Sequence, residues 1–262
     1  MIYLNSRKEM INMTKPFETI KTVSYYECNN RLMLTKANLA LFLQEAAIEH
    51  SDSIGYSTKS LLDIKRGWII TNWHIVFEKT PVFGDTLTIK TWSEGCKHFL
   101  AGRSYTVSDS KGNILVKASS RWVYMNLEER KPDTITKEMA DRYSCDTPPV
   151  FEKERFKMPK EAEREADFIY NATVLRSQTD TNGHTNNTQY IAWAMDAVPD
   201  EIYNNMNGYD LRVVYRKESY KGNSVSIRTY IDDIDGEKQI NTFITGPDKD
   251  IIYAQVTSLW KK

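Results

Sequence analysis

The segment from 180 to 190, DTNGHTNNTQY, gathers side chains that can move protons or polarise a carbonyl group. His184 supplies an imidazole, which can donate or accept a proton near neutral pH. Asn182 supplies an amide that can orient water, and Asp180 supplies a carboxylate. The same residue types are common in turns and helix caps, so taken alone this segment favours a turn over a site.

The surroundings of this segment suggest how it is placed. A strand-like stretch, 168–177, precedes it, and a helical pattern, 186–198, follows it. If the run is extended, its alternate side chains Asp180, Asn182 and His184 lie on one side. Because a helix begins with unpaired N–H groups, we predict an oxyanion site there, made by the backbone of His184, Thr185 and Asn186.

The chain contains an internal repeat. Residues 73–92 align with 211–230 without a gap, at an offset of 138 positions. The same offset relates 112–122 to 250–260. We interpret this match as a duplication, in which each copy forms the same structural unit.

Each copy begins with an amphipathic helical pattern, 37–51 or 186–198, and continues into alternating strand patterns. This order predicts an α+β unit in which an antiparallel sheet wraps around a helix. The residues predicted to form the buried helix faces are Leu39, Phe42, Leu43, Ala46 and Ala47 in the first copy, and Ile191, Ala194, Met195 and Val198 in the second.

The stretch 130–167 is charged, contains four prolines and lacks sustained apolar periodicity. It indicates a boundary between two domains. We predict an N-terminal domain over 1–145, a linker over 146–166 with a short helix near 161–166, and a C-terminal domain over 167–262.

The two copies differ in chemistry. The second has Glu218 and Ser219 where the first has Thr80 and Pro81, and the first has no histidine before its helix. The second copy is therefore the expected catalytic half. An ion pair between Glu218 and a nearby basic residue is the alternative explanation for that carboxylate.

Composition excludes several classes of protein. The formal net charge is zero, which disfavours general nucleic-acid binding. No run of about 18 apolar residues predicts a membrane span, and no signal-peptide core is present, so we expect a cytoplasmic protein without membrane insertion. Three distant cysteines and four histidines lack metal-ligand spacing, and no phosphate loop occurs. We expect neither a metal nor a cofactor.

Two ordered patterns carry a family resemblance. The first is D-x-N-x-H-x-N-N-x-x-Y, from Asp180 to Tyr190, and the second is Y-R-x-E, from Tyr215 to Glu218. With these patterns, and over roughly residues 17–260, the chain resembles the acyl-acyl carrier protein thioesterases, fatty-acid-releasing enzymes of plants and bacteria. The resemblance implies a tandem hotdog fold, with two antiparallel sheets that each wrap around a long helix.

One position departs from the family pattern. Plant members usually have cysteine after the glutamate, and this chain has Ser219. A cysteine nucleophile is therefore unavailable there, and a serine nucleophile needs a base beside it. We expect Ser219 to orient water or a neighbouring side chain.

The activity that the resemblance implies is hydrolysis of the thioester between a fatty acid and acyl carrier protein. Asn182 and His184 would position the carbonyl group and the water. Glu218 or Asp180 would act as the base or orient His184, and an anhydride formed by Asp180 is a further possibility.

Hydrolysis of acyl-coenzyme A and a non-catalytic hotdog module that binds acyl thioesters are the alternatives. Either a monomer or a homodimer is compatible with a tandem repeat.

This activity requires a pocket for the acyl chain and a docking surface for the carrier protein. We expect the first half to form the acyl-chain pocket, although for most of the candidates core packing is the favoured explanation: Leu39, Phe42, Leu43, Ala46, Trp68, Ile70 and Trp73. An acidic carrier protein would dock on basic residues, for which the candidates are Arg212, Arg216, Lys217 and Lys221 near the site, and Lys153, Arg155, Lys157 and Lys160 in the linker.

Overall fold

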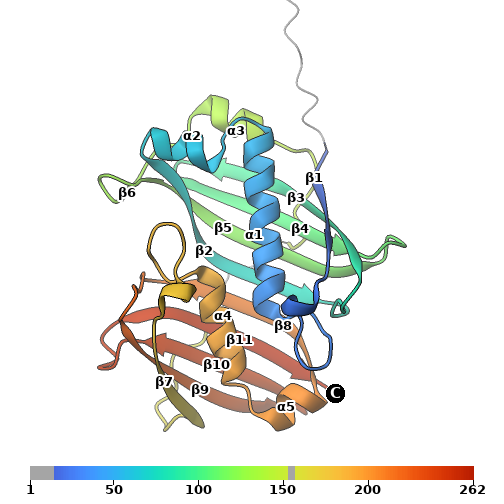
Figure 1. The fold of residues 1–262 in the computed structure, drawn as a ribbon, viewed down its shortest axis with the longest axis vertical. Helices are drawn as coiled ribbons and strands as arrows, with labels where there is room; N and C mark the ends of the chain where they lie inside the picture. Colours follow the sequence, from blue (N-terminus) through green and yellow to red (C-terminus); the bar gives the residue numbers. More distant parts are fainter. Residues whose placement is uncertain (1–14, 153–156) are drawn as a thin grey trace, which may run out of the picture.

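The computed structural model describes residues 15–152 and 157–262, which form two similar α+β halves (Figure 1). The first half contains β1 (Phe17–Thr22), α1 (Lys36–Ser53), α2 (Thr58–Asp63), β2 (Arg66–Phe77), β3 (Thr86–Lys97), β4 (Leu100–Ser108), β5 (Ile114–Asn126), β6 (Lys131–Pro132) and α3 (Lys137–Tyr143). The second contains β7 (Phe168–Thr173), α4 (Asn187–Asp196), α5 (Asp200–Asn205), β8 (Asn207–Tyr215), β9 (Ser224–Ile234), β10 (Glu237–Thr245) and β11 (Ile252–Lys261).

The strand order confirms the internal repeat. It reads β1-β3-β4-β5-β2-β8-β11-β10-β9-β7, so each half has the same order and the two meet at β2 and β8. The offset of 138 holds at the strand ends, because β3 starts at Thr86 and β9 at Ser224, while β2 ends at Phe77 and β8 at Tyr215. The predicted fold, two antiparallel sheets that each wrap around a helix, is confirmed.

The two sheets are joined edge to edge. Strands β2 and β8 pair antiparallel from Asn72 opposite Val214 to Val76 opposite Asp210. Across this seam His74 Nε2 lies 2.9 Å from Asp210 Oδ2. One hydrogen-bonded sheet therefore runs through the molecule, with α1 and α4 on the same face of it (Figure 1).

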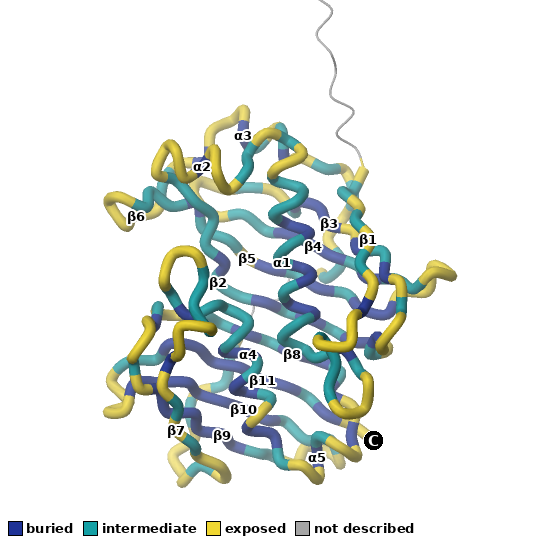
Figure 2. The backbone as a smooth tube through the Cα atoms, viewed as in Figure 1, coloured by how far each residue is buried: buried dark blue, intermediate teal, exposed yellow. Residues whose placement is uncertain are grey.

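The helices pack as their apolar periodicity predicts. Every predicted buried position of α1 is buried, and in the second half only Met195 stays partly exposed. Thr35 caps α1 by accepting a hydrogen bond from the Asn38 N–H, and Asn186 caps α4 in the same way through Thr188. Figure 2 shows the buried residues concentrated in the strands behind these two helices.

The short helix predicted near 161–166 is wrong, because this stretch has no regular secondary structure. The Glu161 carboxylate instead accepts hydrogen bonds from Arg228 and from the Tyr230 hydroxyl, which fix the chain against β9. Among the described residues, no helix is long and apolar enough to cross a membrane.

Candidate active site

The run from 180 to 185 forms a tight turn, not the extended segment that we predicted. Asp180 Oδ1 accepts hydrogen bonds from the backbone N–H groups of Asn182 at 2.8 Å and of His184 at 3.0 Å. The Asp180 N–H in turn reaches the His184 carbonyl oxygen at 2.7 Å. Gly183 completes the turn with a φ of 78°, where a side chain would be strained. The aspartate therefore builds the loop, and its Oδ2 has no hydrogen-bond partner among the described residues.

The first half contains the same turn without the same chemistry. Asn29 Oδ1 accepts hydrogen bonds from the N–H groups of Arg31 at 3.0 Å and Met33 at 3.1 Å. Asparagine thus supports this turn as well as aspartate does. The carboxylate of Asp180 is therefore not required by the backbone conformation, which points to a chemical role.

His184 faces a carboxylate from the next strand connection. Its Nε2 lies 3.6 Å from Glu218 Oε2, an ion-pair distance rather than a short hydrogen bond. The same oxygen accepts hydrogen bonds from Arg130 at 2.6 Å and from the Tyr220 hydroxyl at 2.9 Å. The alternative explanation of Glu218 as an ion-pair partner thus holds in part, because the carboxylate meets both Arg130 and the imidazole.

Arg130 was not found from the sequence. It lies in the turn between β5 and β6 of the first half, 88 positions before Glu218. In the sequence, Arg130 is simply a basic residue in a turn, and such residues are common on any protein surface. Contact between the halves is what gives this residue a place at the site.

Ser219 is fully buried, and its hydroxyl contacts Thr185 of the turn and Tyr190 of α4. Its Oγ lies 2.6 Å from Thr185 Oγ1 and 2.7 Å from the Tyr190 hydroxyl. Burial raises the pKa of Tyr190, which remains a neutral phenol. Ser219 does not line the cavity described below. Its observed contacts fasten the loop to α4, in agreement with a role in orienting neighbours rather than in attack.

The three N–H groups predicted to hold an oxyanion are each bonded within the protein. The N–H of Asn187, the first residue of α4, has no acceptor among the described residues, and Asn187 lines the cavity. The predicted oxyanion position stays a prediction, and the N–H of Asn187 is the neighbouring group left to hold an anionic oxygen. The acceptors of His184, Thr185 and Asn186 are Asp180 Oδ1, the Ser219 carbonyl oxygen and the Gln178 carbonyl oxygen.

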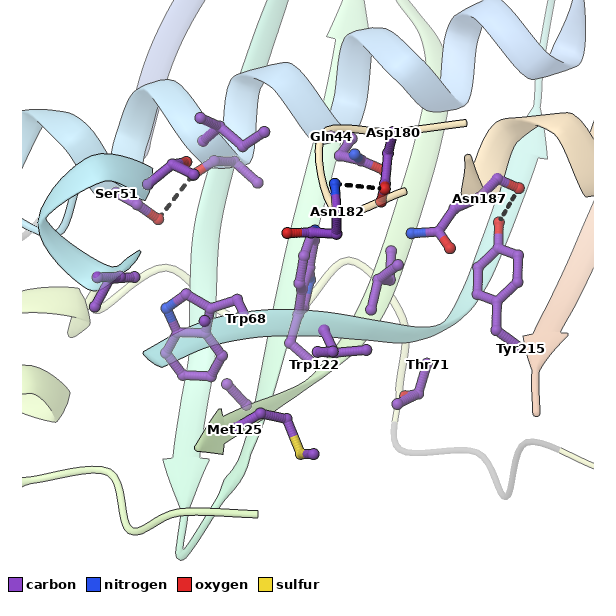
Figure 3. A pocket seen from close by; sticks show the side chains of 18 of the residues that line it. Gln44, Ser51, Trp68, Thr71, Trp122, Met125, Asp180, Asn182, Asn187 and Tyr215 are labelled. Atoms are coloured by element: carbon purple, nitrogen blue, oxygen red, sulfur yellow. Dashed lines mark hydrogen bonds between the residues drawn. The ribbon is translucent and has the colours of Figure 1, made fainter. Parts of the chain in front are cut away.

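A cavity of about 580 Å³ extends from this loop into the first half (Figure 3). Asp180, Asn182, His184 and Glu218 line one part of it. From there it follows one face of α1, formed by Gln44, Ala47, Ile48 and Ser51. The rest of its lining in the first half is largely aromatic and apolar and includes Tyr56, Leu61, Trp68, Trp122 and Tyr143, with the charged side chains of Arg66 and Arg103 among them.

The cavity follows a different face of α1 from the one predicted for the acyl-chain pocket, which stays a prediction. Of the candidates, Trp68 and Ile70 line the cavity. The remaining candidates are packed in the core: Leu39, Phe42, Leu43, Ala46 and Trp73. The cavity runs along the neighbouring stripe of α1, which is more polar and therefore escaped a search for apolar residues.

The corresponding space in the other half is nearly closed. A pocket of about 30 Å³ lies beside the turn at Asn29 and is lined by Tyr203 of α5 and by Trp260. Lys36 occupies this region, where its Nζ donates to the Gly208 carbonyl oxygen at 2.6 Å and lies 3.8 Å from the centre of the Phe77 ring. Desolvation by burial lowers the pKa of Lys36 to about 7.

Basic residues surround the open cavity. Arg216 and Lys217 are exposed and line it, whereas Arg212 is bonded to Asp210 on β8. Lys221 is exposed in the turn before β9. Of the basic residues predicted in the linker, Lys153 and Arg155 lie outside the described residues, and Lys157 and Lys160 have no contact with the cavity.

Both halves of the chain match models of one protein family. Residues 14–143 match the acyl-ACP thioesterase N-terminal domain, and residues 161–262 match the acyl-ACP thioesterase C-terminal domain. An acyl-[acyl-carrier-protein] hydrolase of Cuphea viscosissima is 30% identical over 72% of this chain and 49% of its own length. An oleoyl-acyl carrier protein thioesterase of Arabidopsis thaliana is 28% identical over 82% of this chain and 64% of its own length.

The chain therefore spans roughly half to two thirds of the length of these relatives. Solved structures share its fold. An acyl-ACP thioesterase from Bacteroides thetaiotaomicron has a TM-score of 0.82 at 22% identity, covering 93% of this chain and 97% of its own. A 12:0-ACP thioesterase from Umbellularia californica has a TM-score of 0.83 at 23% identity, covering 94% of this chain and 93% of its own. The chain belongs to the acyl-ACP thioesterase family.

Proposed function

We propose that this protein hydrolyses the thioester of fatty acyl-acyl carrier protein, releasing a free fatty acid and thereby ending fatty acid synthesis. The observation that carries the proposal is one continuous cavity with two different ends. Polar residues of the 180–184 turn line one end, and apolar and aromatic residues of the first half line the other. A thioester at the polar end would leave its acyl chain in the apolar end.

Water attacks the thioester carbon in this mechanism, and Asp180 Oδ2 takes its proton. Asp180 suits this role better than Glu218, because the Glu218 oxygen that faces His184 already accepts hydrogen bonds from Arg130 and Tyr220. The tetrahedral oxyanion is held by the Asn187 N–H and by the Asn182 amide. The carbon–sulfur bond then breaks, and His184, oriented by Glu218, gives a proton to the departing sulfur.

Acyl carrier protein is the proposed partner. Arg216 and Lys217 at the cavity suit an acidic protein that carries its acyl group on a phosphopantetheine arm. A coenzyme A thioester has the same arm and could reach the same cavity. The carrier protein is favoured because the two plant relatives are an acyl-[acyl-carrier-protein] hydrolase and an oleoyl-acyl carrier protein thioesterase.

The test is incubation with acyl carrier protein thioesters of varied chain length, followed by measurement of free thiol and fatty acid. Acyl-coenzyme A of the same chain lengths is assayed in parallel. We expect a higher kcat/KM for the carrier-protein substrates, and loss of hydrolysis by about 100-fold or more in His184→Ala and Asn182→Ala. If the protein bound acyl thioesters tightly without hydrolysing them, the proposal would be wrong and the non-catalytic binding module would be the better description.

A further inference from the structure

Gln44 is a polar residue on the stripe of α1 that lines the cavity. It lies in the middle of α1, beside Leu43 and two positions before Ala46, which both belong to the buried core, while its other neighbour, Glu45, is partly exposed. The Gln44 side chain lines the cavity together with Asp180 and Asn182. In Figure 3 it extends from α1 on the side where the turn of the second half approaches that helix.

The amide oxygen of Gln44 lacks a donor. Oε1 is buried, and no described residue donates a hydrogen bond to it. A buried carbonyl oxygen without a donor destabilises a fold, because it has given up its hydrogen bonds to water. The unpaired oxygen thus destabilises the protein in the absence of a ligand. A group in the cavity can supply the missing N–H or O–H when the Gln44 side chain turns Oε1 toward the cavity that it lines.

The other half shows that the helix does not need a polar residue here. Counted from the capping residues Thr35 and Asn186, the position of Gln44 corresponds to Met195 in α4. Met195 packs against the apolar core of its half, beside the space that is nearly closed. At this position of the helix, an amide side chain therefore occurs in α1 and not in α4.

We propose that Gln44 is a further catalytic residue, whose Oε1 accepts a hydrogen bond from the attacking water. This inference rests on the proposed function. One hydrogen of the water is held by Gln44, and the other passes to Asp180 as the water oxygen bonds to the thioester carbon. The carbon–sulfur bond breaks, the thiol takes its proton from His184, and the hydrogen held by Gln44 stays on the product acid. Two acceptors on one water molecule fix the direction of its remaining lone pair.

The experiment compares Gln44→Leu with wild type and with Gln239→Leu, a glutamine of β10 that lies away from the cavity. Two small substrates are used: the S-octanoyl thioester of N-acetylcysteamine, which has an amide N–H, and that of ethanethiol, which has neither an N–H nor an O–H. We expect kcat of Gln44→Leu to fall about tenfold or more on both substrates, with KM nearly unchanged. Its melting temperature should not fall, because the substitution removes an unpaired buried acceptor.

Gln44→Glu keeps the acceptor and should recover part of the rate that Gln44→Leu loses. An unchanged kcat in Gln44→Leu, a change in KM alone, or a loss confined to the amide-bearing substrate would overturn the inference, the last by showing that the glutamine binds the phosphopantetheine arm. A wild-type protein that hydrolyses neither these substrates nor acyl-acyl carrier protein would overturn the proposed function and this inference together.

Discussion

Arg130 Nη2 in the first half lies 2.6 Å from Glu218 Oε2 in the second, so a contact between the halves holds the carboxylate that faces His184. Arg130→Met should reduce kcat about fivefold, because a surface ion pair contributes only weakly to positioning the carboxylate. Stability should change little, because the Arg130 side chain is 68% exposed. Steady-state kinetics and thermal denaturation measure both. Arg121→Met, which breaks a different arginine–glutamate pair, is the control and should leave kcat unchanged.

Asp180→Asn separates the two roles of the aspartate. The variant should fold like wild type, since Asn29 supports the same turn in the first half. Its kcat should fall by about 100-fold or more, because an amide cannot take the proton from water. Circular dichroism and turnover of acyl-acyl carrier protein report the two effects. Full activity in this variant would reduce Asp180 to a turn residue.

Ser219→Ala should affect stability more than catalysis. The buried hydroxyl bonds to Thr185 and to Tyr190, so its removal should cost about 1–3 kcal/mol in the free energy of unfolding. Turnover at a temperature well below the melting transition should stay in the range of the wild type. Mass spectrometry during turnover should detect no acyl-serine. Abolished turnover in a folded variant would restore a covalent serine mechanism.

Ile48→Phe should shift the substrate preference toward shorter acyl chains. Ile48 lines the cavity on α1, and a larger side chain there reduces the space beyond Gln44. The fatty acids released from a chain-length series of acyl-acyl carrier proteins give the measurement. Phe42→Leu changes the core face of the same helix and should lower stability without moving the chain-length profile. The cavity would be misassigned if the two variants gave the same product profile.

The double variant Arg216→Glu, Lys217→Glu should raise KM for acyl-acyl carrier protein and spare a small thioester. The reversed charges oppose an acidic partner, and the difference should shrink near 1 M salt, where the screening length is about 3 Å. Lys117→Glu reverses a charge on β5, away from the cavity, and serves as the control. Equal losses on both substrates would place the two residues in the chemistry rather than in docking.

Much of the fold could be predicted because both halves have strong, repeated apolar periodicity. The offset of 138 positions predicts the strand pairing of one half from that of the other, and it singles out Glu218 as a difference between the copies. The conformation of the 180–184 turn could not be predicted from alternation, because the Asp180 side chain competes with an extended backbone by binding two N–H groups. Arg130 and Gln44 were missed since each reaches the site only through contact between the halves.

The closed pocket beside Lys36 has a consequence for stoichiometry. The duplicated architecture would offer one binding cavity beside each of the two equivalent turns. Beside the turn at Asn29, however, Tyr203 and Trp260 leave a pocket of only about 30 Å³. Each polypeptide of 262 residues should therefore bind a single acyl chain. At the closed site, Lys36 of α1 instead joins the two halves by donating a hydrogen bond to Gly208 of β8.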